Sequence, residues 1–395
     1  MSGELLRQLV EGDLARRREL RHLRTREVLQ AIDSTHVQRG DSRHVNFASN
    51  NYLGLTHHPR LVRAAQEAIA VHGTGSGASA LVSGYSPAHQ AAEADLAEWK
   101  TTEAAVLMPS GYQAAHAVVQ TIAAISSRGR GGVRFLIDKL SHACLIDAVQ
   151  ASRQPFRIFP HNHLAKLARL LAGAPSGELQ VVLTESIFSM DGDAADLQGL
   201  CELRRSRPFV LVLDEAHATG VYGPAGAGYA AECRLSADID ISIVTLSKAL
   251  GLAGGAVCAS RLFCDALVNA GRAYVYSTSV PPVLPSAVSA AIRIIRDESH
   301  RQQRLRVLAA RVRQRLAQRG LAIRGGDSPI IPVILGAEQR ALDAADHLRQ
   351  RGLWVVAIRP PTVPRNSSRL RITLCCDHTD EEVERLIEAI SCLPG

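Results

Sequence analysis

The chain has 395 residues, of which 46% are hydrophobic and 21% charged, and a formal net charge of +7, a composition typical of a globular protein with a large core. It argues against a membrane or secreted protein, because no stretch reaches the about 20 apolar residues of a spanning helix and the charged N-terminus has no signal-peptide segment; we expect a cytoplasmic protein. Dispersed basic residues with only 4% aromatic residues argue against nucleic-acid binding, and eight cysteines without a C-x-x-C pair argue against a metal site.

Residues 1–45 predict a polar, helical N-terminal arm. Between residues 16 and 26 basic side chains alternate with leucines, the pattern of an amphipathic helix with a basic face. This face is either solvated or turned towards an anion, and the pattern is compatible with both.

Residues 46–282 alternate between short apolar runs and longer helical stretches. Polar or Gly residues bound most of the runs. This alternation predicts βαβ units and a mostly parallel sheet. The expected strands lie at residues 104–108, 135–137, 181–184, 209–213, 243–246 and 255–259.

Residues 283–395 predict a smaller α+β domain. A long helical stretch follows Pro281-Pro282 and runs to about Leu316. The last helix is expected to begin at Thr379, because Glu382 three residues later completes a capping box. The expected strands of this domain are 330–335, 354–358 and 370–374.

Polar residues that could take part in catalysis follow two of the expected strands. Lys248 closes one strand and enters a loop of small residues, and Asp214 ends another, with His217 three residues further on. In open α/β sheets ligands bind at the carboxyl ends of the strands. A lysine held there suits a covalent bond to a cofactor aldehyde, and an acid suits a protonated ring nitrogen. A surface lysine and a nucleotide-binding acid are the alternatives, but the chain has no phosphate-binding G-x-x-x-x-G-K loop for the second.

Four further motifs end strands or form turns in the same way. Pro109–Gln113 is a glycine turn that opens a helix, where free backbone N–H groups suit a phosphate. Ser141-His142 follows Asp138, Glu185–Gly192 follows the strand at 181–184, and Tyr276–Ser279 is rich in hydroxyl groups. Each is weak alone, and together they indicate a cofactor site.

This ordered set of motifs resembles the α-oxoamine synthases, a family of pyridoxal-phosphate (PLP) enzymes of fold type I. The resemblance extends from about Asn46 to Ile390 and also rests on Asn46–Leu55, Gly75–Ser79 and Leu81–Ser86. It implies an α/β fold-type I PLP-dependent transferase. The expected parts are an N-terminal helical arm (1–45), a large PLP-binding domain with a mostly parallel sheet (46–282) and a small C-terminal α+β domain (283–395). It also implies a homodimer with its sites at the subunit interface.

The resemblance implies a role for each matching residue. Lys248 would carry PLP and act as base, Asp214 would face the pyridine nitrogen, His217 the phenolic oxygen, and His142 would stack on the ring and touch the substrate. The other implied cofactor contacts are Gly111, Tyr112, Ser189 and Thr245, with Ser277 and Thr278 reaching the phosphate of the neighbouring subunit. The implied substrate contacts are Arg371, which would hold the amino-acid carboxylate, Asn50, Thr362 and Arg24; no metal is implied.

The family joins an amino acid to an acyl thioester and releases carbon dioxide. Residues 82–90 and 357–374 resemble members that use L-alanine and a pimeloyl thioester, on coenzyme A or an acyl carrier protein, in biotin biosynthesis. A sister enzyme that uses glycine or another acyl thioester is the alternative, because Ala80 replaces an arginine and Leu250–Ala253 replaces an aromatic-containing loop. A non-catalytic partner subunit is disfavoured, because such partners lack the lysine at position 248.

Overall fold

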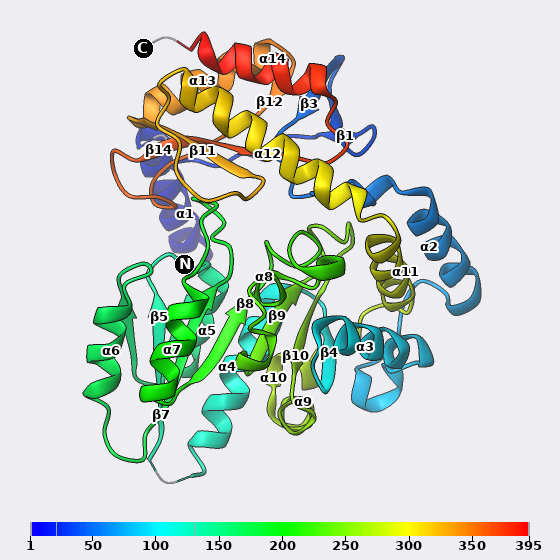
Figure 1. The fold of residues 1–395 in the computed structure, drawn as a ribbon, viewed down its shortest axis with the longest axis vertical. Coiled ribbons are helices and arrows are strands. Elements are labelled where there is room, and N and C mark those ends of the chain that lie inside the picture. The colour runs from blue at the N-terminus through cyan, green and yellow to red at the C-terminus, as the bar shows by residue number, and fades with distance from the viewer. Residues whose placement is uncertain (1, 21, 130, 394–395) are drawn as a thin grey trace.

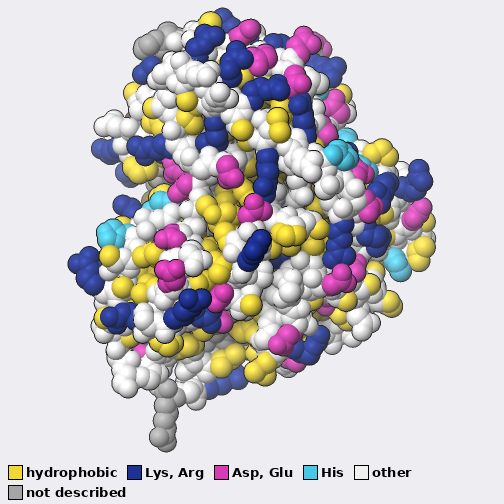
Figure 2. Space-filling model, viewed as in Figure 1, with side chains coloured by type: hydrophobic (Ala, Val, Ile, Leu, Met, Phe, Trp, Pro, Cys, Tyr) yellow, Lys and Arg dark blue, Asp and Glu magenta, His cyan; other side chains and the backbone are white. Residues whose placement is uncertain are grey.

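The computed structural model describes residues 2–20, 22–129 and 131–393. Figure 1 shows a large domain around a central sheet, a smaller domain at the C-terminal end, and helix α1 (Ser2–Glu19) beside the smaller domain. Among the described residues no helix combines the length and the apolar character needed to span a bilayer. On the face drawn in Figure 2, basic and acidic side chains are interspersed rather than gathered in one patch.

The large domain is built on a seven-stranded sheet of order β4-β10-β9-β8-β7-β5-β6. All strands run parallel except β10, which is antiparallel to both of its neighbours, so the mostly parallel sheet is confirmed. The expected strands are all present, whereas edge strand β6 was missed because its exposed residues give no apolar run. The strands are Ala104–Met108 (β4), Val133–Asp138 (β5), Phe156–Phe159 (β6), Leu179–Glu185 (β7), Val210–Asp214 (β8), Ile241–Thr245 (β9) and Gly255–Ala259 (β10).

Helices cover both faces of this sheet, because successive strand side chains point to opposite sides. Phe135 and Ile137 of β5 pack with helices α4 and α5, whereas Leu136 between them packs with α6 and α7. The strands are therefore buried on both faces, which explains their continuous apolar runs. These helices are Gly111–Ser126 (α4), Ala143–Ser152 (α5), Leu164–Ala172 (α6) and Leu197–Ser206 (α7).

The long helical stretch after Pro282 is two helices, α11 (Val283–Asp297) and α12 (His300–Gln318). The helix stops at Glu298, whose backbone leaves the helical region (φ −112°, ψ 51°). Helix α11 packs against α2 (Pro59–His72) and α3 (Pro87–Lys100). By its packing it belongs with the large domain, although the sequence placed the boundary at residue 282. The remaining large-domain helices are α8 (Tyr229–Glu232), α9 (Arg261–Ala270) and α10 (Arg272–Val275).

The small domain contains two sheets and takes part of its structure from the N-terminal segment. One sheet has the order β11-β14-β13 and the other β1-β2-β3-β12. Its helices are α12, α13 (Glu338–Gln350) and α14 (Asp380–Ser391), and the capping box of α14 is confirmed. The strands are Gln30–Ala31 (β1), His36–Arg39 (β2), Ser42–Asn46 (β3), Ile330–Gly336 (β11), Leu353–Trp354 (β12), Val356–Ile358 (β13) and Ser368–Thr373 (β14).

The expectation of a helical arm over residues 1–45 is wrong in its second half. Only α1 is helical, whereas β2 and β3 form a hairpin whose turn contains Gly40 at φ +55°. Strand β3 then pairs in parallel with β12. The hairpin was missed because its strands are short and polar, and the pairing with β12 joins residues that are far apart in the sequence.

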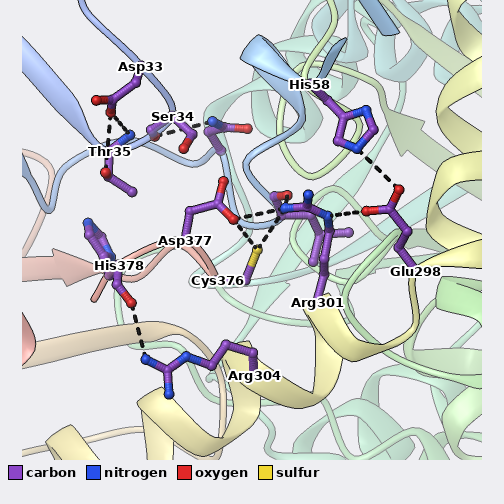
Figure 3. Close-up of polar contacts among 12 residues, drawn as sticks. Asp33, Ser34, Thr35, His58, Glu298, Arg301, Arg304, Cys376, Asp377 and His378 are labelled. Atoms are coloured by element: carbon purple, nitrogen blue, oxygen red, sulfur yellow. Dashed lines mark hydrogen bonds and ion pairs between the residues drawn. The ribbon is translucent and has the colours of Figure 1, made fainter. Parts of the chain in front are cut away.

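A polar junction centred on Arg301 ties the two domains together, and Figure 3 shows it. From α12, the Arg301 guanidinium donates to Glu298 (2.8 Å), to Asp377 (2.8 Å) and to the carbonyl of Leu53 (3.2 Å). Cys376, together with Cys375 and Asp377, places metal-ligand atoms within 4.8 Å of one another, and two of the three, Cys376 and Asp377, face the Arg301 cation.

Asp377 can approach this junction only because residue 54 is glycine. A Cβ atom on Gly54, whose φ is +68°, would lie 1.9 Å from a carboxylate oxygen of Asp377. Glu298 also faces His58 at 3.2 Å. The chain segment from Leu53 to His58 is therefore held between the two domains.

Candidate active site

Lys248 lies beyond the carboxyl end of β9, in contact with His217, which lies three residues after the end of β8. Its Nζ is 2.9 Å from Nε2 of His217, whose Nδ1 is 2.6 Å from the hydroxyl of Tyr52. Tyr52 and His217 are both buried. The structure thus brings together Lys248 and His217 as predicted, and adds Tyr52, which sequence reasoning did not select.

Asp214 is the last residue of β8 and is buried beside Lys248. One carboxylate oxygen accepts from the backbone N–H of Ala216 (2.9 Å), and the other lies 3.9 Å from the Cys144 sulfur. His142 caps the N-terminus of α5 by accepting from the backbone N–H of Cys144 (3.2 Å). The strand ends therefore carry the predicted lysine, acid and both histidines to one place.

Burial drives the ionisable groups of this site towards their neutral forms. It raises the pKa of Asp214, although Lys248 opposes the rise. It lowers the pKa of Lys248, against the attraction of Asp214 and Glu185. It also lowers the pKa of His217 well below its ordinary value, and Lys248 adds to that effect. Such clusters are typical of catalytic sites.

Glu185 is a second buried acid of the site. It ends β7 directly opposite Asp214 in the strand pairing. Burial raises the pKa of Glu185 to about 8, and the neighbouring Asp214 adds to the rise. Its Oε1 is buried without a hydrogen-bond partner in the described structure, an unusual state for a buried oxygen. A signal for Glu185 was present in the sequence, since this residue directly follows an expected strand, but no role was assigned to it.

The turn before α4 forms a narrow polar cradle. A Cβ atom on Gly111 would lie 2.3 Å from the Thr245 hydroxyl oxygen, and one on Gly255 would lie 2.6 Å from the Gly111 nitrogen. Glycine at these positions lets the N-terminus of α4 approach Thr245 closely. Backbone N–H groups at a helix N-terminus and an adjacent hydroxyl suit a phosphate. The side chain of Tyr112 is exposed and donates to Asp147 (2.9 Å).

Arg371 reaches the site from β14 of the small domain. Its Nε donates to the carbonyl of Ser189 (2.7 Å), Nη1 to the Thr373 hydroxyl (3.0 Å) and Nη2 to Asn50 (3.1 Å). The hydroxyl of Tyr52 also donates to Asn50 (3.4 Å). These contacts fix the guanidinium while using three of its five N–H donors. Predicted residues Asn50, Ser189 and Arg371 are therefore together, and Thr373 was missed.

Arg24 and Thr362 line one cavity of about 940 Å³ between the N-terminal segment and the small domain. Strand β13, which pairs with β14, also contributes to its wall. Ser277 and Thr278 lie elsewhere, on a turn after α10 where Thr278 bridges to Ser79. Within that turn the hydroxyl of Ser277 donates to the carbonyl of Thr278 (3.3 Å).

The mostly parallel sheet, with its lysine and acid at the strand ends, is the architecture of a fold-type I PLP-dependent transferase. The chain belongs to the aminotransferase class I and II family, whose sequence profile matches residues 42–390.

Individual proteins and solved structures that resemble the chain agree with this family assignment. Over 385 residues the chain is 41% identical to the 8-amino-7-oxononanoate synthase of Pseudescherichia vulneris, covering 97% of this chain and 98% of that protein. Among solved structures, a serine palmitoyltransferase variant of S. paucimobilis with a bound PLP–myriocin aldimine matches with a TM-score of 0.91 at 26% identity, covering 98% and 97% of the two chains. The 8-amino-7-oxononanoate synthase of Francisella tularensis matches with a TM-score of 0.76 at 25% identity, covering 88% and 97%.

Proposed function

We propose that the chain is a PLP-dependent 8-amino-7-oxononanoate synthase of biotin biosynthesis. It would join L-alanine to a pimeloyl thioester and release the thiol and carbon dioxide. The observation that carries the proposal is the convergence of Lys248, Asp214 and His217 with Arg371, in a chain that aligns over nearly its whole length with synthases of this name.

The residues present fit PLP. Asp214 offers a carboxylate to the pyridine nitrogen, His217 an N–H to the phenolic oxygen and Lys248 an amine to the aldehyde, while the exposed ring of His142 is available for stacking. The cradle at Gly111 and Thr245 is narrow enough for a phosphate to receive several donors at once. When bound, PLP withdraws electrons from the amino acid through its protonated ring nitrogen.

The chain's own groups supply binding and proton transfer. Arg371 pairs with the carboxylate of L-alanine, because its guanidinium is already fixed by Ser189 and Asn50. Lys248 has a lowered pKa because it is buried, and this leaves a larger share of Nζ neutral and able to take the Cα proton. His217 contacts Nζ at 2.9 Å and restricts where the amine points.

The reaction would form one carbon–carbon bond and break two bonds. The alanine Cα forms a bond to the thioester carbonyl carbon, and the thiolate of coenzyme A or of an acyl carrier protein leaves. The carboxylate that Arg371 held departs as carbon dioxide, and the Cα is reprotonated from Nζ of Lys248. The cavity lined by Arg24 and Thr362 is where we place the acyl thioester, since both predicted substrate contacts border it.

We further propose a homodimer that shares its sites. Ser277 and Thr278 follow the exposed Tyr276, and Thr278 bridges to Ser79, close in the chain to the exposed Leu81 and Val82. A second copy covering these exposed side chains would bring both hydroxyls to its own PLP phosphate. Mixing inactive Lys248→Ala subunits with inactive Ser277→Ala, Thr278→Ala subunits should then restore part of the activity. Heterodimers that form without any recovery would contradict the shared site.

The direct test is the product. PLP-loaded protein is incubated with L-alanine and pimeloyl-CoA, and the products are weighed by mass spectrometry. We expect 8-amino-7-oxononanoate, with little product from glycine or L-serine, or from palmitoyl-CoA. Preferred use of another amino acid or acyl chain would identify a sister synthase instead, and absence of product with every pair, including pimeloyl acyl carrier protein, would contradict the proposal.

A further inference from the structure

His161 is a histidine held between two carboxylates near the site. Its Nδ1 lies 3.0 Å from Asp138 and its Nε2 lies 2.6 Å from Asp193. The ring also packs edge-on against Phe188, with centroids 4.3 Å apart. Both ring nitrogens face acceptors, so the ring donates at both ends when it is protonated.

The two carboxylates belong to different segments of the site. Asp138 ends β5 and is buried, and it also accepts from the backbone N–H groups of Leu140 and Asn162 (2.8 and 2.9 Å). The contact with Leu140 fixes the turn that leads directly to His142. Asp193 lies in the loop of residues 186–194, which follows β7.

That loop is the one that holds Arg371. The backbone of Phe188 donates to the carbonyl of Asp193 (2.9 Å), and the next carbonyl, that of Ser189, accepts from Nε of Arg371 (2.7 Å). Asp193 is thus connected to the substrate arginine through two residues. A ring that fixes Asp193 and packs on Phe188 also fixes the position of the Ser189 carbonyl.

The charge on His161 makes this bridge strong. Burial lowers the pKa of the imidazole, but hydrogen bonds to Asp138 and Asp193 outweigh it and raise the pKa to about 10. The ring is therefore an imidazolium at neutral pH. Charge-assisted hydrogen bonds are shorter and about twice as strong as neutral ones.

We propose that His161 is a positioning residue. It holds the turn before His142 at a fixed distance from the loop of residues 186–194, which contacts Arg371, and so sets the position of the cofactor ring relative to the substrate carboxylate. The proposal rests on the proposed function for the identity of the ligands. His161 itself touches neither ligand; it acts through the two segments that it joins.

The chain offers a matched control. His36 also lies between two carboxylates, Asp33 and Glu382, each at 3.0 Å, and is similarly shielded from solvent. It joins the N-terminal segment to α14, away from the site. Replacing His36 by Gln removes the same kind of bridge and should lower stability without altering the site.

The test compares His161→Gln with His36→Gln. Both variants are titrated with PLP and, once loaded, with L-alanine, using PLP absorbance, and melting temperatures are measured in parallel. We expect His161→Gln to weaken binding of both ligands by about tenfold, the scale of one lost charge-assisted hydrogen bond. His36→Gln should leave both affinities unchanged. His161→Arg, which keeps a cation with donors at two ends, should recover part of the affinity.

Equal affinities in the two Gln variants, at any melting temperature, would overturn the proposal. If His161→Gln does not fold, Asp193→Ala removes the acceptor at the more exposed end of the same bridge, and unchanged affinities there would overturn the proposal as well. Failure of the proposed function is seen separately, as wild-type protein that makes no 8-amino-7-oxononanoate. The PLP titration still decides the role of His161 in that case.

Discussion

Two polar clusters of this protein respond to burial in opposite ways. At the Arg301 junction acidic and basic side chains face one another, and the pKa values of Arg301 and Glu298 move towards the charged forms. Although burial opposes it, the hydrogen bond to Glu298 raises the pKa of Arg301. Glu298 has a lowered pKa, because Arg301 and His58 outweigh the effect of burial. At the strand ends burial prevails instead, and Lys248 and Asp214 are shifted towards neutrality.

The difference separates a structural cluster from a reactive one. Paired ions stabilise the fold, and because the partner favours the charged form, they do not exchange protons readily. Groups whose charged forms are destabilised by burial can give or take a proton more easily when a ligand binds. Mutations at the junction should therefore lower the stability of the fold, whereas mutations at the strand ends should lower ligand binding or turnover. Four predictions test this division, from the largest expected effect to the smallest.

Lys248→Ala should abolish turnover, by at least about 10³-fold, the scale of a lost general base. It should not lower the melting temperature of the cofactor-free protein, because it removes a buried amine whose charge is disfavoured. Steady-state kinetics and a melting curve measure the two effects. Turnover near wild type would remove Lys248 from the chemistry, and a large loss of stability would place it with the junction residues.

Arg371→Lys should weaken L-alanine binding by about 1–3 kcal/mol, because an ammonium cannot replace the planar fork on a carboxylate. PLP binding should change little. The measurement is a titration of the loaded protein with L-alanine, followed by PLP absorbance. Arg304→Lys is the control, since Arg304 pairs with Asp380 at the junction (2.9 Å) and should leave the alanine affinity as it is. Equal affinities for all three proteins would contradict the assigned role.

Arg301→Gln should destabilise the fold by about 1–3 kcal/mol, the range for hydrogen bonds to charged groups, while the affinity for L-alanine is retained. It breaks the contacts that join α12 to Asp377 and Leu53. Urea unfolding gives the stability, and the titration described for Arg371 gives the affinity. Loss of affinity without loss of stability would show that the junction belongs to the site.

Glu185→Gln should flatten the dependence of stability on pH. The folded-state pKa is about 8, above the ordinary value of about 4.3. The contribution of Glu185 to the free energy of unfolding is therefore fully present below about pH 4 and is lost as the pH rises to about 8. Melting temperatures of the cofactor-free protein across this window should fall more steeply for wild type than for the variant. Parallel curves would mean that Glu185 titrates normally.

Much of the fold could be predicted because strands and caps are local features. The runs that became β4 and β10 were expected with the observed bounds, and the capping box at Thr379 marked the start of α14. The hairpin of β2 and β3 could not be predicted in the same way. Its place in the small domain depends on β12, about 300 residues away in the chain, and a local pattern does not encode such a pairing.

The sequence by itself determined which residues stand at the strand ends. Lys248 and Asp214 follow apolar runs, and the carboxyl ends of parallel strands meet at one edge of the sheet. Only the tertiary structure decided what those residues touch. Tyr52 meets His217 across 165 residues of chain, and His161 joins Asp138 to Asp193. Burial, which sets the pKa values of Glu185 and Lys248, arises from packing of the whole chain, so it leaves no mark in the neighbouring sequence.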